Sequence, residues 1–316
     1  MEMRWLNSRV FAILAGGCLL VSLLSAQSPK RPKILGLAHV AFFAHDFDQS
    51  RKFYGEFLGF DEVFPLKNTD GTPSMTFFKI NDRQYIELSP EKTAGSDRLS
   101  HIAFETDDID GLRQYLAAKG VKVPSHAERG RIGNLAFNIT DPAGHTVEMV
   151  QYMPSEQTML NFGKRLGSNR ISQHMTHAGL LVTDLDPEYR FYTEVLGFTE
   201  TWRGSSNGTV LSWINLKAPD SDDYVELMLA KTAPAENARG GAHHLCLVVP
   251  DVPEAVVKLK ATAYMKEYPR EIEVHLGKNR KRQANLFDPD GTRTEVMEPR
   301  TIDGVAPPPS SAPPPG

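Results

Sequence analysis

The chain has 316 residues, of which 41% are hydrophobic and 23% are charged, and its formal net charge is −4. This is an ordinary globular balance, and the length suggests about two domains. The small negative charge argues against nucleic acid or an anionic membrane surface as a partner. We therefore expect a small-molecule substrate and no nucleic acid, and the sequence leaves the oligomeric state open.

The first segment has the layout of a secretory signal peptide. Arg4 and Arg9 precede the apolar run VFAILAGGCLLVSLL, and the small residues Ser25 and Ala26 follow it. A basic start, a short apolar middle and a small-residue end are typical of such signals. We therefore assign residues 1–26 to a signal peptide and expect an exported protein, periplasmic or secreted. The alternative is a segment that is retained and anchors the protein to a membrane.

Two pairs of segments repeat further along the chain. DFDQSRKFYGEFLGF (46–60) matches DLDPEYRFYTEVLGF (184–198). An aspartate at the start, apolar residues three to four apart and a glycine at the end predict a short capped amphipathic helix. NLAFNITDPAGHTVEMV (134–150) likewise matches NLFDPDGTRTEVM (285–297). The shared Asp-Pro-x-Gly sequence predicts a turn that joins two strands of a hairpin.

A histidine begins each of four apolar runs, and an aspartate follows seven residues later. The runs are HVAFFAHD, HIAFETDD, HAGLLVTD and HLCLVVPD, and they begin at His39, His101, His177 and His244. A second histidine, His243, precedes the last run and is one residue too far from the aspartate. Neighbouring side chains of a strand point to opposite faces. We therefore expect His244 to share the role of the other three and His243 to face solvent or a neighbouring element.

A glutamate between apolar residues ends each repeat, in the segments YIEL, TVEM, YVEL and TEVM; these are Glu87, Glu148, Glu226 and Glu295. A unit of one strand, one helix and three strands therefore occurs four times. We expect two domains at residues 27–152 and 172–300, joined by a linker at 153–171. The Pro-rich residues 301–316 have a composition that predicts disorder.

The histidines and glutamates are candidate metal ligands. The first and last strands of one unit can be neighbours in a sheet, so that its histidine and glutamate point into one concavity. A glutamate on an apolar strand is costly to bury unless it is paired or bound to metal. Two units together would offer two imidazoles and two carboxylates, which suit zinc, iron, manganese or nickel. The alternative is a set of buried ion pairs without metal.

Taken together, the histidine-led runs, the FYxxxLGF helices, the DPxG hairpins and the four glutamates resemble the vicinal oxygen chelate superfamily. This group includes glyoxalase I, extradiol dioxygenases and bleomycin-resistance proteins, and the resemblance covers Ile34 to Pro299. It implies an α+β fold of four βαβββ modules, paired into two cupped mixed-sheet domains. Each cup would hold a divalent metal (Zn, Ni, Fe or Mn). The implied ligands are His39, Glu87, His101 and Glu148 in the first cup, and His177, Glu226, His244 and Glu295 in the second.

The resemblance leaves three functions open. Glyoxalase I-like lyase or isomerase chemistry is favoured because both cups keep four ligands. Glu148 or Glu295 would then act as the base that moves a proton beside a carbonyl of a substrate with adjacent oxygens. The residues after Glu87 and Glu226 depart from the glyoxalase I pattern, however.

The second candidate is an extradiol ring-cleavage dioxygenase. It would use His177, His244 and Glu295 on Fe(II), with His275 as the acid–base residue. The tyrosine of that family falls at about Asn285 here. The third candidate is a drug-sequestering protein of the bleomycin-resistance type, although those proteins lack the His/Glu set. The basic run at 277–282 predicts a solvated loop or, alternatively, a rim that attracts an anionic substrate.

Overall fold

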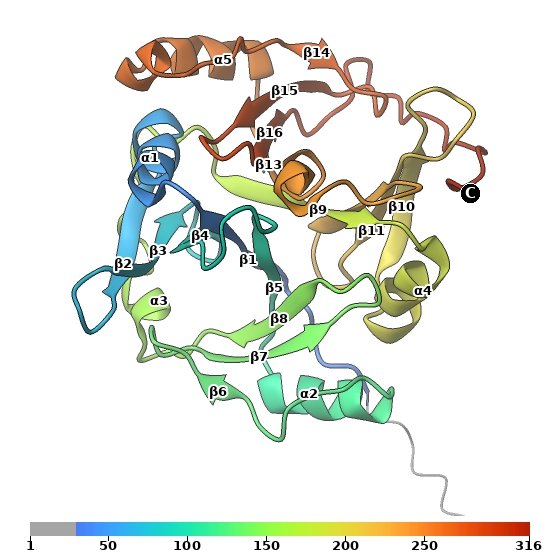
Figure 1. Cartoon of the computed structure of the whole chain (residues 1–316). Helices are drawn as coiled ribbons and strands as arrows, with labels where there is room; N and C mark the ends of the chain where they lie inside the picture. Colours follow the sequence, from blue (N-terminus) through green and yellow to red (C-terminus); the bar gives the residue numbers. More distant parts are fainter. Residues whose placement is uncertain (1–29) are drawn as a thin grey trace, which may run out of the picture.

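Each half of the chain forms one eight-stranded mixed sheet that curls into a cup, as the computed structural model of residues 30–316 shows (Figure 1). The first sheet has the strand order β2-β3-β4-β1-β5-β8-β7-β6. Its strands are β1 (Gly36–Ala44), β2 (Asp61–Lys67), β3 (Pro73–Lys79), β4 (Tyr85–Pro90), β5 (Leu99–Glu105), β6 (Glu128–Arg129), β7 (Leu135–Thr140) and β8 (Thr146–Gln151). The predicted α+β fold of two cupped sheets is confirmed.

The second sheet repeats this arrangement, with the order β10-β11-β12-β9-β13-β16-β15-β14. Its strands are β9 (His174–Val182), β10 (Thr199–Gly204), β11 (Trp213–Lys217), β12 (Tyr224–Leu229), β13 (His244–Val248), β14 (His275–Leu276), β15 (Arg282–Phe287) and β16 (Arg293–Met297). The α-helices are α1 (Phe47–Lys52), α2 (Ile109–Ala118), α3 (Gln157–Leu160), α4 (Leu185–Arg190) and α5 (Val252–Lys260). Among residues 30–316, no helix is long and apolar enough to span a membrane. The predicted signal peptide lies outside the described residues.

The strand pairing places the four central strands of each sheet side by side. Within a module the first and last strands are parallel neighbours, as in β1 with β4 and β5 with β8. The two modules of a domain then join through the antiparallel pair β1–β5, and β9–β13 does the same in the second domain. Modules therefore pair within one chain, and every histidine-bearing strand lies beside a glutamate-bearing strand.

The aspartates seven residues after the histidines begin the helices, as predicted. Asp46, Asp108 and Asp251 each accept a hydrogen bond from a backbone N–H in the first turn, at 3.1, 2.9 and 2.7 Å. Asp184 occupies the same position without such a side-chain bond. In both FYxxxLGF segments the α-helix continues into a π-helical turn, at Phe53–Phe57 and Phe191–Val195. The tyrosines of these turns are thereby buried.

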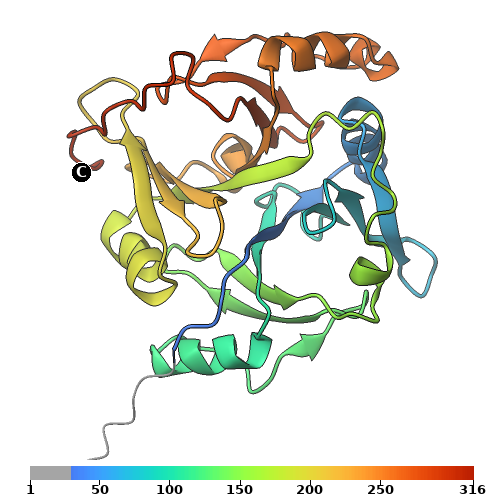
Figure 2. The ribbon, with the colours of Figure 1, turned by 180° about the vertical axis from the view of Figure 1, so that it is seen from behind.

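The linker packs against the first domain on its way to β9 (Figure 2). The Lys79 side chain is fully buried and donates to the carbonyl oxygens of Asn161 and Lys164, at 2.6 and 2.8 Å. Gly59 has a φ of +77°, and a Cβ there would lie 2.4 Å from the Asn169 carbonyl oxygen. The glycine that ends the predicted helix is therefore also required for the linker to pass.

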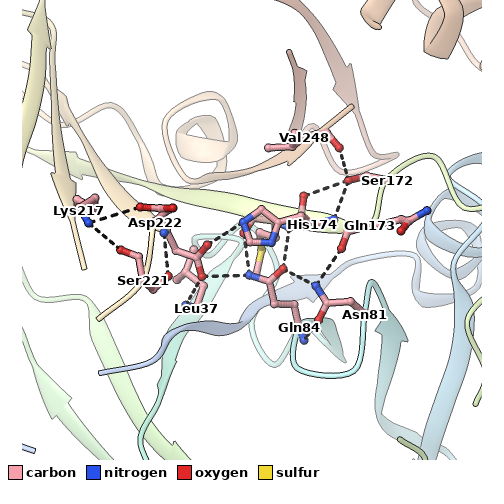
Figure 3. Close-up of polar contacts among 12 residues, drawn as sticks. Leu37, Asn81, Gln84, Ser172, Gln173, His174, Lys217, Ser221, Asp222 and Val248 are labelled. Carbon is pink, nitrogen blue, oxygen red and sulfur yellow. Dashed lines mark hydrogen bonds and ion pairs between the residues drawn. The ribbon is translucent and has the colours of Figure 1, made fainter. Parts of the chain in front are cut away.

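A buried polar network joins the two domains where β1 and β9 approach each other (Figure 3). The Gln84 side chain pairs with the Met175 backbone, donating to its carbonyl at 2.8 Å and accepting from its N–H at 2.8 Å. Asp223 accepts from the Leu37 N–H at 2.9 Å and from Gln84 at 3.2 Å. Reciprocal contacts lie beyond this network, because Tyr54 donates to Asp288 and Tyr192 donates to Asp141.

The C-terminal segment lies along the second domain, a placement that departs from the disorder its composition predicts. Ser310 donates its N–H to the Arg203 carbonyl at 2.9 Å, and Leu211 donates to the Pro313 carbonyl at 2.8 Å. β10 is an edge strand, so its outer backbone groups are open to such pairing. The segment thus occupies part of the edge of the second sheet.

We expect Gln84→Ala to destabilise the protein. The substitution leaves the buried N–H and carbonyl of Met175 without partners, and each such group costs about 1–3 kcal/mol. Chemical denaturation with metal removed should show the loss. The exposed Gln114→Ala on α2 is the matched control and should change the free energy of unfolding by less than about 0.5 kcal/mol. Equal stability of the two variants would contradict the bridging role of Gln84.

Candidate metal centres

The four predicted residues of the first domain meet at the centre of its cup. His39 on β1 and His101 on β5 bring their Nε2 atoms to 2.9 Å from each other. Glu87 on β4 lies 3.6 Å from the His39 Nε2 and 3.9 Å from the His101 Nε2. Glu148 on β8 approaches the same two atoms with different oxygens, at 3.7 and 3.8 Å. His39, His101 and Glu87 therefore form one compact group of candidate ligands, and Glu148 lies within 4 Å of both histidines beside it.

The second cup repeats this geometry. The Nε2 atoms of His177 on β9 and His244 on β13 are 3.1 Å apart. Glu226 on β12 and Glu295 on β16 each lie 3.9 Å from the His177 Nε2, and 3.6 and 3.7 Å from the His244 Nε2. A Cβ at Gly179 would lie 2.0 Å from the His244 ring, so this position on β9 requires glycine. All eight predicted ligands are thus brought together, four in each cup.

Burial determines the protonation of these side chains in the metal-free fold. Burial raises the pKa of Glu87 to about 8 with help from Glu148, and raises that of Glu148 to about 7. Burial and the neighbouring Glu295 raise the pKa of Glu226 to about 8. Burial also lowers the pKa of His101 to about 4. In each cup the protein has removed from water four groups that are expensive to charge there.

A divalent cation is the group that this arrangement fits. Neutral imidazole and carboxylate are the donors that zinc, iron, manganese and nickel share. The Nε2 of His177 and one oxygen of Glu295 face the other ligands of the second cup, while the remaining oxygen of Glu295 is buried without a hydrogen-bond partner among the described residues. A cation among the carboxylates would compensate their charge and would favour neutral imidazoles. The residues present therefore fit a metal in both cups.

The surroundings of the two cups differ. A cavity of ≈ 130 Å³ adjoins the first cup and reaches His39, Glu87 and Glu148. Aromatic and aliphatic side chains form most of its wall, among them Phe64, Met75, Phe77, Tyr85, Ile132 and Tyr152. The first cup therefore offers an apolar space beside its carboxylates.

The cavity of ≈ 330 Å³ at the second cup is more polar. His275, proposed above as an acid–base residue, lies on its wall together with Glu226 and Glu295. Lys278 and Asn279 of the basic run also line it, which places part of that run at the rim. Trp202 and Trp213 line the same cavity.

Arg293 distinguishes the second cup, and sequence reasoning missed it. Its guanidinium Nη2 lies 2.8 Å from the Nε2 of His244. The Nδ1 of His244 donates to the Ala242 carbonyl at 2.7 Å, so the Nε2 carries the lone pair that a metal would need. Arg293 is the first residue of β16 and lies two residues before Glu295. Residues two apart on a strand face the same side, so this spacing could have indicated that Arg293 lies beside the second cup.

Sequence reasoning also missed a cluster outside the cups, between the two domains. It contains Asp141, His145 and Glu188, and His145 meets His243 from the other domain. His243 therefore faces a neighbouring element and points away from the second cup, as predicted. The available signal was the histidine that ends the DPAGH turn.

Comparison with known proteins agrees with this geometry. The sequence model of the Glyoxalase/Bleomycin resistance protein/Dioxygenase superfamily matches residues 36–149 and 174–296. The chain belongs to this superfamily. The two matched stretches coincide with the two cupped sheets, so the resemblance seen in the motifs is confirmed.

One relative by sequence is a 3-methylcatechol 2,3-dioxygenase from Pseudomonas putida, which is 31% identical over 173 residues. The match covers 51% of this chain and 56% of that protein, about half of each. Two solved structures share the fold. The 2,3-dioxygenase LapB from Pseudomonas sp. KL28 has 19% identity, a TM-score of 0.64 and coverage of 90% of this chain and 97% of its own. The Mn(II)-bound glyoxalase from Novosphingobium aromaticivorans has 19% identity, a TM-score of 0.62 and coverage of 84% and 83%.

We expect metal binding to release protons at neutral pH. Because the pKa values of Glu87 and Glu226 are raised to about 8, both carboxyls are largely protonated at pH 7 in the metal-free fold. A metal requires them ionised, so loading at pH 6.5 should release more protons than loading at pH 9. Calorimetry in two buffers of different ionisation enthalpy measures this release. Equal release at both pH values would contradict the expectation.

The same shifts predict how the stability of the metal-free protein depends on pH. A carboxyl whose folded pKa lies above its ordinary 4.5 stabilises the fold at low pH, and this contribution is lost as the pH rises through about 8. The free energy of unfolding should therefore fall between pH 6.5 and 8.5. Glu87→Gln removes one titrating group, so the fall should be shallower in that variant.

We expect Arg293→Leu to tighten metal binding in the second cup. The guanidinium lies 2.9 and 2.8 Å from the two ring nitrogens of His244, so its positive charge repels a cation bound there. Its removal should improve affinity by about tenfold or more, since unit charges a few ångströms apart interact by several kcal/mol at low effective dielectric. Competitive titration with a chelating dye measures the change. The exposed Arg190→Leu on α4 is the control and should leave both cups unaltered.

Proposed function

We propose that the protein is a divalent-metal-dependent enzyme that acts on a small substrate with two adjacent oxygens. The observation that carries the proposal is the first cup, where two imidazoles and two carboxylates converge beside an aromatic-lined cavity. At ≈ 130 Å³ the cavity is about the size of one that holds a benzene ring. Membership of the superfamily supports the same conclusion.

The favoured reaction is a glyoxalase-type proton transfer in the first cup. A bound metal would act as a Lewis acid toward the adjacent oxygens. His39, His101 and Glu87 would hold it. The side chain of Glu148 is 18% exposed toward the cavity, against 6% for Glu87, and is better placed to meet the substrate. Glu148 would take a proton from the carbon beside the carbonyl and return it to the neighbouring carbon, so that no oxidant is consumed.

The aromatic wall of the cavity would serve this step by excluding water. Phe64, Phe77 and Tyr152 enclose the space next to the carboxylates. A carboxylate in such a place is a stronger base than one in water, because burial disfavours its charged form. The same wall would select a substrate with a small apolar group beside its oxygens.

Extradiol ring cleavage in the second cup is the second candidate. Two observations favour it: the sequence similarity to a 3-methylcatechol 2,3-dioxygenase and the position of His275 on the wall of the cavity that holds Glu295. His177, His244 and Glu295 would hold the metal. His275 would exchange a proton with the substrate hydroxyl, and Arg293 and Lys278 would favour an anionic substrate.

We also propose that the chain is exported, on the basis of residues 1–26 alone. Fractionation of cells that express the full chain tests this proposal. Recovery from the periplasm or medium in a shortened form supports a cleaved signal. Recovery of the full-length chain with membranes would favour the retained anchor.

Two assays on the metal-loaded protein separate the reactions. The first follows deuterium incorporation from deuterium oxide into the hemithioacetal of methylglyoxal and a small thiol, without oxygen. The second follows oxygen uptake with catechol and 3-methylcatechol. We expect deuterium exchange, and we expect Glu148→Gln to slow it by about 10²–10⁴-fold, the range for loss of a positioned base. The exposed Glu128→Gln is the control.

The outcome of each assay has a defined meaning. Oxygen uptake that His244→Ala abolishes and Glu148→Gln leaves intact would replace the favoured reaction with ring cleavage in the second cup. Activity that survives both substitutions would contradict both assignments. Metal content measured on each variant shows whether a loss of rate reflects a loss of metal.

A further inference from the structure

We propose that His145 and His243 form a third transition-metal site, at the interface of the two domains and separate from both cups. His145 ends the DPAGH turn between β7 and β8 in the first domain, and His243 immediately precedes β13 in the second. Their Nε2 atoms are 3.2 Å apart. Both side chains are buried, with 9% and 2% of their area exposed.

The two rings repeat the mutual geometry of the imidazole pairs in the cups. Their centroids are 5.1 Å apart and their planes are inclined at 86°. The values are 5.0 Å and 81° for the pair in the first cup, and 5.2 Å and 87° for the pair in the second. Two nitrogens on a tetrahedral zinc ion, each about 2.05 Å from it, are about 3.3 Å apart. The observed 3.2 Å is close to that separation.

Carboxylates fix the tautomers of both rings. The Nδ1 of His145 lies 2.8 Å from Asp141, and the Nδ1 of His243 lies 2.8 Å from Asp97. An ionised carboxylate only accepts hydrogen bonds, so each Nδ1 carries a proton and donates it. The two Nε2 lone pairs then face each other, and a cation is needed between them. A carboxylate behind each imidazole is also the arrangement that orients histidine ligands in metal sites.

The surroundings leave room for the remaining ligands. A cavity of ≈ 320 Å³ adjoins both rings and is lined also by Ser100, Thr146 and Arg239. Water or an anion in this cavity would complete the coordination. Asp97 and Asp141 supply negative charge, while burial and the neighbouring Asp141 raise the pKa of Glu188 to about 9 and keep it neutral at pH 7. Arg239 is the cation that faces the site among the described residues, and it lies 3.2 Å from Asp97. Imidazole ligands suit zinc, cobalt, nickel or copper.

Anomalous diffraction from crystals of the wild-type protein grown with cobalt(II) tests the site directly. We expect a peak within about 2.0–2.3 Å of both the His145 and the His243 Nε2 atoms, in addition to peaks in the cups. Peaks in the cups with none between these histidines would overturn the proposal. Such a result would mean that a shared proton joins the two rings.

Elemental analysis of variants provides the second test. His145→Gln and His243→Gln should each lose one metal equivalent per chain relative to wild type, and the double variant should lose no more than either single variant. Asp97→Asn should keep the site but weaken it by about 10–100-fold, as expected for the partner of a histidine ligand. The exposed His126→Gln is the control and should retain every equivalent. Unchanged metal content in the folded double variant would also overturn the proposal.

Discussion

The burial of two carboxylates within 4 Å of two imidazoles is the constraint on which each domain depends. Such groups are unfavourable in a protein interior unless a compensating charge lies among them. The order of the strands makes the convergence unavoidable, because β4, β1, β5 and β8 are consecutive neighbours and each contributes one ligand. A divalent cation removes the penalty, and the sheet then holds four ligands in place without any contribution from loops.

The sequence was sufficient to predict this part of the protein because its signals are local and repeated. The spacing from His39 to Asp46 defines a strand followed by a capped helix, and the same spacing recurs three times. Strand alternation separated His244 from His243. Arg293 and the His145–His243 contact were not predicted, because the sequence marks these residues only by position and their contacts depend on how strands and domains pack. The placement of the C-terminal segment was not predicted for a similar reason. It pairs with the backbone of an edge strand, and backbone groups have no sequence pattern of their own.

The two cups have kept one ligand set and acquired different surroundings. In the first, Phe77 and Tyr152 enclose a small apolar space beside Glu148. In the second, Arg293 and Lys278 bring positive charge to a larger cavity. A guanidinium beside the ligands repels a metal cation, so the first cup should bind metal more readily. The same positive charge attracts an anionic substrate, which favours the second cup for such a substrate. Equal ligand sets therefore do not imply equal metal affinity or one common substrate.

The neighbouring residues His243 and His244 connect these features. His244 points into the second cup, and His243 points to the DPAGH turn of the first domain. The alternation of a strand gives adjacent residues opposite faces, so one short segment serves a metal cup and the domain interface together. Reciprocal contacts support the same interface, because Tyr54 reaches Asp288 and Tyr192 reaches Asp141. A metal ion bound between His145 and His243 would hold the backbone next to His244 in place. Because the two histidines are consecutive, one peptide bond connects the domain interface to the second cup.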